Sequence, residues 1–303
     1  MPTFAVLAHT QPLLLRRFVD RLRPHPVVVH LDRKADRRAF ERALSGAGTV
    51  TVLPDSARVD VHWAGFSAVR AMTAVAEAAL EGTPHDDYVV MCSGSDYLLR
   101  PVAELAAHLG SSAGLQHIRY FDVENSAPHY RRQVTRRHYR DAWAFRSQRG
   151  THGERVNNAV RRGLSAATFL LPDRRPPEGL RLAFGSQWFA VTAACLRALL
   201  NERTPAIDRY FARTFSPDEK YFHSLMASSP FHSSTPAGGF EPYVGLGTYR
   251  LANLHHIDPS LHTWFTQDDW AQLAVSPAWL FRKVRLPASL QLLDHIDRVR
   301  LHQ

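Results

Sequence analysis

The first third of the chain alternates short apolar runs with amphipathic stretches. Residues 26–31 and 87–92 are nearly continuous apolar runs, which are typical of parallel strands buried on both faces. The alternation of such runs with amphipathic stretches is typical of βαβ units, and it predicts a parallel sheet covered by helices. The segments of this pattern are 3–8, 12–23, 26–31, 35–44, 49–53, 65–81, 86–91, 101–108 and 115–120.

Length and composition favour one folded body. The chain has 303 residues, 45% of them hydrophobic, and no Gly/Ser/Pro-rich linker divides it. The apolar runs are much shorter than the roughly 20 residues that cross a bilayer, so no membrane span is expected. A strand-like run near the N-terminus leaves no room for a signal peptide, so we expect a cytoplasmic protein. Cys92 and Cys195 lie in apolar contexts typical of buried thiols.

Arginine dominates the charge of +9 and is concentrated at 131–149 and 155–175. A basic surface of this kind attracts polyanions. It is also compatible with ordinary solvated charge, or with a loop over a phosphate-bearing substrate or an anionic acceptor. Aromatic residues between the arginines, at Tyr130, Tyr139 and Trp143, would suit nucleic-acid binding. No recognition motif accompanies them, and nucleic acid is not expected as a partner.

Polar residues follow the predicted strands at the edge where parallel sheets bind ligands. His9 and His30 stand at the ends of the first two strands, and Asp32 follows the second. Each histidine is either a hydrogen-bonded structural residue or a ligand contact. Asp32 is either a turn or N-cap residue or a ligand contact. Asp96, in the turn after the run at 86–91, either stabilises that turn or contacts a ligand.

Several common chemistries lack their motifs. The chain has no Gly-x-Gly-x-x-Gly after the first strand and no Gly-Lys-Ser/Thr phosphate loop, which disfavours dinucleotide cofactors and P-loop chemistry. It contains 17 histidines but no His-Glu-x-x-His run, and it has no Gly-x-Ser-x-Gly nucleophile elbow. Neither a zinc hydrolase nor a serine hydrolase is supported.

Two acidic residues, Asp218 and Glu219, precede an apolar helical stretch. Ser216, Pro217 and Glu219 have the spacing of a capping box with proline at the first helical position. Alternatively, a carboxylate that faces partly inward, near Phe222 and His223, has a pKa biased upward, towards that of a general base. The pattern alone leaves both interpretations open.

The chain resembles the core-2/I-branching enzymes, glycosyltransferase family 14, which include β-1,6-N-acetylglucosaminyltransferases and peptide O-xylosyltransferases. The resemblance covers nearly the whole chain, because seven short motifs occur in the order of the family. These motifs are Ala-His-Thr-Gln-Pro (8–12), Val-Val-Val-His-Leu-Asp (27–32), Val-His-Trp-Ala-Gly-Phe-Ser-Ala-Val (61–69), Cys-Ser-Gly-Ser-Asp-Tyr-Leu-Leu-Arg-Pro (92–101), Gly-Ser-Gln-Trp-Phe-Ala-Val-Thr (185–192), Ser-Pro-Asp-Glu (216–219) and Leu-Phe-Arg-Lys (280–283).

The resemblance implies an α/β fold of the GT-A-like type, with a Rossmann-like nucleotide-binding half and a mixed central sheet. It implies a single glycosyltransferase domain over residues 1–303. Within this domain, 1–120 would bind the nucleotide, 121–245 would supply the acceptor and catalytic half, and 246–303 would clamp the diphosphate.

The resemblance also implies an inverting, metal-independent transfer of a sugar, most simply N-acetylglucosamine from UDP-N-acetylglucosamine, to an acceptor hydroxyl with a β-linkage. No cofactor or metal is expected, and no Asp-x-Asp element is present to hold one. UDP-xylose or another nucleotide sugar is the alternative donor. A non-catalytic binder of anionic ligands or nucleic acid is the alternative from another class.

Residue roles follow from matching positions in the family. Glu219 would be the general base, and Asp218 would orient the acceptor or cap the helix. Ser186 and Gln187 would contact sugar hydroxyls, and Trp188 is either a sugar platform or a core residue. Fixed cations would replace the metal at the diphosphate. These cations are Arg282 or Lys283, from a motif one residue shorter than the family's, together with Arg250 or His255; His9, His30, Asp32 and Asp96 complete the expected donor site.

Overall fold

A computed structural model of the protein describes residues 1–112, 114–142, 152–245 and 247–301. Its centre is a five-stranded sheet in the order β3-β2-β1-β4-β8. The pairs β3–β2, β2–β1 and β1–β4 are parallel, and β8 pairs antiparallel with β4. The predicted α/β fold with a mixed central sheet is therefore confirmed. The strands are β1 Thr3–Ala8, β2 Val27–Leu31, β3 Val50–Val52, β4 Tyr88–Ser93 and β8 Ala190–Thr192.

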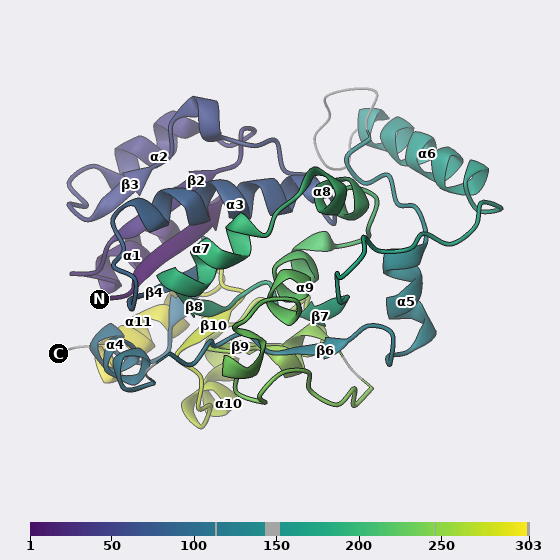
Figure 1. Ribbon diagram of the computed structural model, residues 1–303. Coiled ribbons are helices and arrows are strands. Elements are labelled where there is room, and N and C mark those ends of the chain that lie inside the picture. Colours follow the sequence, from purple (N-terminus) through teal and green to yellow (C-terminus); the bar gives the residue numbers. More distant parts are fainter. Residues whose placement is uncertain (113, 143–151, 246, 302–303) are drawn as a thin grey trace.

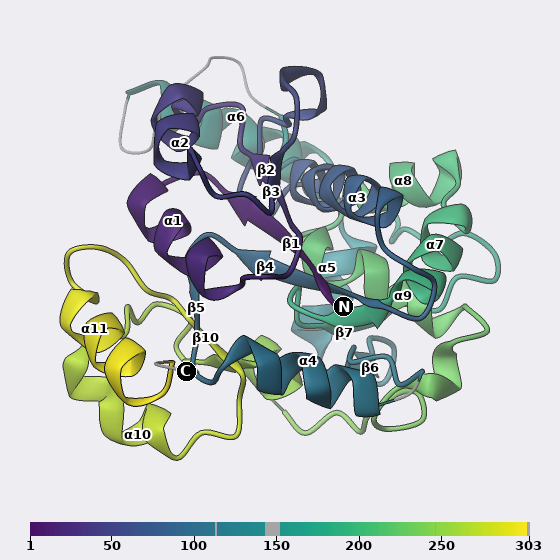
Figure 2. The same cartoon turned by 90° about the vertical axis from the view of Figure 1, so that its left-hand side faces the viewer.

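Helices cover both faces of this sheet (Figures 1 and 2). Every residue of β2 and β4 is buried, as their continuous apolar runs predicted. Alternate residues of β1 enter two apolar cores: Ala5 packs with α3, α7 and α9, while Phe4 and Val6 pack with α1, α2, α4 and α11. The bounds are α1 Pro12–Arg21, α2 Arg37–Leu44, α3 Phe66–Glu81, α4 Val102–Ser111, α7 Ala193–Asn201, α9 Tyr221–Ala227 and α11 Leu290–Val299.

A second sheet joins segments that are far apart in the sequence. It has the order β5-β10-β9, with β5 at Asp96–Leu98, β10 at Leu280–Arg282 and β9 at His255–Ile257. In its register Arg282 lies opposite Asp96, and Leu280 lies opposite His255. This sheet therefore places three polar residues of the expected donor site beside one another.

The remaining elements surround these sheets. The run at 115–120 yields a strand only at its end, where β6 (Tyr120–Asp122) forms a separate two-stranded sheet with β7 (Ala183–Gly185). No described helix is long and apolar enough to cross a membrane. The other helices and 3₁₀ turns are α5 Pro128–Thr135, α6 His152–Ala167, α8 Pro205–Phe211, α10 Trp270–Ala274, η1 Asp55–Ala57, η2 Pro217–Glu219, η3 His232–Ser234, η4 Thr248–Leu251 and η5 Gln267–Asp269.

Candidate active site

The turn after β4 lies directly against the end of β1. The Gly94 N–H donates to the Leu7 carbonyl at 2.8 Å, and a Cβ at Gly94 would lie only 3.0 Å from the Cβ of Ala8. A larger residue would push the two strand ends apart. Glycine thus keeps the carboxyl ends of β1 and β4 together at the edge where the sequence predicts the donor.

The three polar residues predicted at the ends of β1 and β2 have different surroundings. His9 is exposed just beyond β1. His30 is buried, its Nε2 accepts the Val59 N–H at 2.9 Å, and burial lowers its pKa to about 4, so the ring is neutral. Asp32 is buried and accepts the Lys34 N–H at 2.8 Å, which makes it a turn residue, while Asp36 caps α2. The structural role predicted as one alternative for His30 and Asp32 is present.

Sequence patterns missed two cations in this region. The buried Arg58 guanidinium donates to the carbonyls of Leu31, Asp32 and Ala35 at 2.8 to 3.2 Å. Lys34 pairs with Asp32 at 3.1 Å and also contacts Asp60. Together they fix the loop between β2 and α2. No motif marks them, because their partners are mostly backbone carbonyls.

Asp96, His255 and Arg282 form a buried ionic cluster, which we call the Asp96 cluster. Asp96 is fully buried, and its Oδ2 accepts the Ser93 N–H at 2.7 Å and lies 3.1 Å from His255 Nε2. Its Oδ1 lies 3.0 Å from Arg282 Nε. Burial lowers the pKa of Arg282, and the charge of Asp96 opposes that shift. Oδ2 is therefore hydrogen-bonded, whereas Oδ1 has the ion pair with Arg282 but no hydrogen bond among the described residues. Direct contact of Asp96 with a donor stays a prediction.

The motif at 185–192 places an aromatic wall against this cluster. Trp188 is buried, and the Arg282 guanidinium carbon lies 4.2 Å from its ring centroid. Ser186 is buried and its Oγ accepts the Trp188 N–H at 3.3 Å, while Gln187 is half-buried between β7 and β8. Trp188 thus serves as a core residue and as the platform on which Arg282 rests.

The predicted diphosphate cations lie in three places. Arg282 points into the Asp96 cluster, whereas the Lys283 Nζ donates to the Leu261 carbonyl at 2.8 Å. The Val284 N–H bonds to the Ser95 carbonyl at 2.9 Å, so this segment lies against the turn after β4. Of the two residues considered for the second cation, His255 joins Asp96 and Arg282, and Arg250 lies on η4 instead.

Cys92 adds a thiol to the Asp96 cluster. Atoms of Cys92, Asp96 and His255 that are able to bind an ion lie within 4.8 Å of one another. The Arg282 guanidinium, however, already supplies positive charge to Asp96, and burial raises the pKa of the Cys92 thiol, which keeps it protonated. A divalent cation would have to displace Arg282 and deprotonate Cys92, so these residues do not fit a metal centre.

Asp218 and Glu219 lie on the 3₁₀ turn η2 before α9. The predicted capping box is wrong: Ser216 adopts a left-handed conformation, with φ 45°, and its side chain caps no helix. The Ser216 N–H bonds instead to the Ala64 carbonyl at 3.1 Å, a tertiary contact that local spacing does not reveal. Glu219 is consequently released from the capping role.

Sequence patterns missed two residues that support this turn, Thr248 and Lys220. Together with Asp218 and Glu219 they form what we call the Glu219 cluster. Thr248 Oγ1 donates to Glu219 Oε1 at 2.7 Å. Lys220 is fully buried, and its Nζ donates to the carbonyls of Phe215 and Ser216 at 3.0 and 3.1 Å. Lys220 therefore fixes the backbone that carries Asp218 and Glu219, and Thr248 orients the glutamate.

The Glu219 cluster contains charge that is only partly compensated. Asp218 Oδ1 is buried and has no hydrogen-bond partner among the described residues. Burial, and then the negative charge of Glu219, raise the pKa of Asp218 to about 7. Burial likewise lowers the pKa of Lys220 to about 8. The charges of Lys220 and Arg282 both oppose the rise at Asp218, so the two clusters interact electrostatically.

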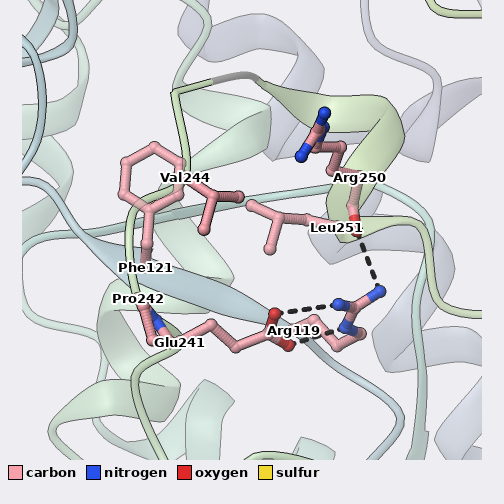
Figure 3. Close-up of a pocket in the computed structure, with 7 residues that line it drawn as sticks. All are labelled: Arg119, Phe121, Glu241, Pro242, Val244, Arg250 and Leu251. Carbon is pink, nitrogen blue, oxygen red and sulfur yellow. Dashed lines mark hydrogen bonds and ion pairs between the residues drawn. The ribbon is translucent and has the colours of Figure 1, made fainter.

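A small cavity of about 340 Å³ opens beside η4, and Arg250 and Leu251 of that turn line it (Figure 3). Arg119 makes a two-pronged ion pair with Glu241, at 2.6 and 2.8 Å, and donates to the Arg250 carbonyl at 2.9 Å. Figure 3 shows the Arg250 side chain directed away from that pair. Because η4 also carries Thr248, one short turn both lines this cavity and holds Glu219.

Comparison with known proteins identifies one family and a set of similar solved structures. The family model described as "Core-2/I-Branching enzyme" matches residues 3–238, which confirms the resemblance predicted from the motifs. No curated protein matches the chain. Among solved structures, the "Crystal structure of 4-diphosphocytidyl-2C-methyl-D-erythritol synthase" shares 14% identity at a TM-score of 0.36, covering 90% of this chain and 96% of that one.

Proposed function

Because the chain belongs to the core-2/I-branching enzyme family, a family of glycosyltransferases, we propose that it transfers N-acetylglucosamine from UDP-N-acetylglucosamine to an acceptor hydroxyl with inversion. The observation that carries this proposal is the Glu219 cluster. Glu219 is excluded from helix capping, oriented by Thr248 at 2.7 Å, and backed by a buried lysine. This is the support expected for a positioned general base.

The proposed chemistry is a single displacement. Glu219 accepts the proton of the acceptor hydroxyl as its oxygen attacks the anomeric carbon. The bond from that carbon to the diphosphate oxygen breaks, and UDP leaves with the electron pair. One displacement on an α-linked nucleotide sugar gives a β-linked product.

The leaving diphosphate needs positive charge, and we propose that protein cations supply it without a metal. Arg282 and Lys283 are the candidates, because their segment is bonded to the turn after β4 through Val284 and Ser95. Arg282 is already neutralised in part by Asp96. Lys283 is therefore assigned the more direct role, and Arg282 holds the wall of the site. The family match ends at residue 238, so this assignment rests on the motif and the geometry.

Calorimetric titration with UDP and UDP-N-acetylglucosamine, with and without EDTA, tests the proposal. Binding that survives chelation supports the protein clamp, and binding that requires metal contradicts it. Lys283→Ala should weaken UDP binding about tenfold, as expected for loss of one charged contact. Arg38→Ala, at an exposed position on α2, is the matched control and should bind like the wild type.

The donor sugar is tested separately. UDP-xylose, titrated and assayed in parallel, is the alternative. If the chain binds UDP and transfers xylose but not N-acetylglucosamine, the clamp and the base stand and the donor assignment fails. If it binds no uridine nucleotide in either condition, the transferase proposal fails as a whole.

A further inference from the structure

The net charge of the whole protein lies in one segment, residues 128–175, which we call the basic arm. It contains 12 of the 37 basic residues and 3 of the 28 acidic ones. The rest of the chain then has 25 of each, so the arm alone accounts for the net +9. The described parts of the arm, 128–142 and 152–175, include α5 and α6, which lie at one edge of the molecule (Figure 1).

The same arm exposes aliphatic side chains. Val156, Val160 and Leu164 are four residues apart on α6 and therefore share one face. Asn157 is the one residue of α6 that is buried, whereas Val156 is half-buried and Val160 and Leu164 are 36% and 37% exposed, so this apolar face is only partly covered by the protein. Beyond the helix, Phe169 is 65% and Leu170 is 92% exposed.

Arginines hold the exposed loop in place. Arg136 donates to the Phe169 carbonyl at 2.9 Å, and its guanidinium carbon lies 5.1 Å from the Phe169 ring centroid. Arg137 donates to the Pro172 carbonyl at 2.9 Å. These bonds fix the backbone on both sides of the exposed Leu170, close to the guanidinium groups of Arg136 and Arg137.

We propose that the basic arm docks on the surface of an anionic lipid bilayer, with the apolar face of α6 and Leu170 in the interface. Helices that combine apolar side chains on one face with arginine on the other bind such surfaces, and each basic residue near the membrane adds attraction. Arg155 and Arg162 are exposed, and their spacing of seven residues places both on the face of α6 opposite Val156, Val160 and Leu164.

Nucleic acid fits the same charge less well. Base stacking requires exposed aromatic rings. Tyr130 is buried, the Tyr139 ring is covered by Arg213 at 4.7 Å, and Trp143 lies outside the described residues. Phe169 has an exposed ring, but the other exposed apolar side chains of the described arm are aliphatic. Aliphatic side chains suit acyl chains and do not stack on bases.

The arm is attached to the loop that leads to Glu219. The Phe215 N–H bonds to the Gln133 carbonyl and the His138 N–H to the Arg213 carbonyl, both at 2.9 Å. The Arg140 guanidinium carbon lies 4.7 Å from the centroid of the exposed Trp63 ring. A docked arm would therefore hold the bilayer close to the proposed base. The docking proposal goes beyond the transfer reaction and does not depend on it.

Co-flotation of the full chain with phosphatidylcholine vesicles, with and without phosphatidylglycerol, tests the proposal. We expect binding to the anionic vesicles to exceed binding to neutral ones, and to fall steeply with salt. Leu170→Glu with Leu171→Glu should reduce it at least about tenfold. Arg155→Glu with Arg162→Glu should reduce it by a similar factor.

Matched controls make the same kinds of substitution at exposed positions outside the basic arm. Val275→Glu alters a residue that is 83% exposed, and Arg38→Glu with Arg42→Glu reverses two exposed arginines on α2. These controls should bind vesicles like the wild type. Circular dichroism melting checks folding, and Leu170→Ser is a milder variant for which a smaller loss is expected.

Three outcomes would overturn the proposal: no flotation with anionic vesicles, equal losses in the arm variants and the controls, or equal binding to neutral vesicles. Polyuridylic acid is the competing probe. If the wild type binds it without floating on vesicles, and the Leu170 and Leu171 changes leave that binding intact, the arm is a nucleic-acid surface.

Discussion

The Asp96 cluster and the Glu219 cluster use similar side chains, yet they satisfy their charges differently. In the Asp96 cluster Oδ2 has hydrogen-bond partners in Ser93 and His255, and Oδ1 is neutralised by an ion pair with Arg282 at 3.0 Å, although no hydrogen bond reaches it among the described residues. In the Glu219 cluster Asp218 Oδ1 is buried without a partner among the described residues, and its pKa is raised to about 7. A buried carboxylate that is neutralised by a fixed guanidinium maintains structure. Carboxylates that the fold leaves incompletely paired retain capacity to exchange protons.

The largest expected effect is on the transfer rate of Glu219→Gln, without a change in UDP binding. Glu219→Gln keeps the hydrogen bond from Thr248 but removes the proton acceptor, so transfer should fall about 1,000-fold. UDP affinity by calorimetry should stay unchanged, and Glu202→Gln at an exposed position is the control. Near-normal activity of Glu219→Gln would move the base elsewhere.

The next effect is on stability. Arg282→Met leaves Asp96 buried without its cation and should lower the free energy of unfolding by about 3 kcal/mol, measured in urea at neutral pH. Adding Asp96→Asn should restore part of that loss, because the uncompensated charge is then gone. If the single change is neutral, Arg282 is not needed to stabilise the cluster.

Asp218→Asn tests the incompletely paired site through pH. The folded pKa of Asp218, about 7, exceeds its ordinary value of 3.8, so the folded state keeps a proton that the unfolded chain releases. Wild-type stability should therefore fall as pH rises from about 4 to about 7. The variant should lack this decline and should be more stable above pH 7, by on the order of 2 kcal/mol. Parallel urea midpoints across the range measure it, and identical pH profiles would contradict the assignment.

The smallest effect concerns orientation. Thr248→Val removes the donor to Glu219 Oε1 and should reduce kcat about fivefold, the equivalent of about 1 kcal/mol. Thr248→Ser retains the hydroxyl and should recover most of the rate. A higher KM for UDP-N-acetylglucosamine with unchanged kcat would mean that Thr248 contacts the donor and does not orient the base.

Much of the fold was predictable because it is local. The run at 3–8 matches β1, and the stretch at 65–81 matches α3 to within one residue, since both depend on periodicity within a few turns or residues. The basic segments at 131–149 and 155–175 were likewise visible in the sequence, although Arg146 and Arg149 lie outside the described residues. The division of the chain into donor, acceptor and clamping segments stays a prediction.

The candidate site was only partly predictable because its pairings are long-range. Glu219 was recognised from its motif, but its partner Thr248 and the bond from Ser216 to Ala64 were not, since no local spacing encodes them. For the second cation the sequence left Arg250 and His255 as alternatives, since neither a motif nor local spacing decides between them. The register of β9 with β10 brings His255 to the Asp96 cluster.

The strand pairing of β5 with β10 also has a consequence for synthesis. Asp96 leaves the ribosome long before His255 and Arg282, and His255 follows it by 159 residues. A nascent chain has to keep this carboxylate hydrated or protonated until then, because an unpaired buried charge is strongly unfavourable. The Asp96 cluster therefore cannot form before residue 282 has been made, so β5 waits for its partner β10 until nearly the end of translation.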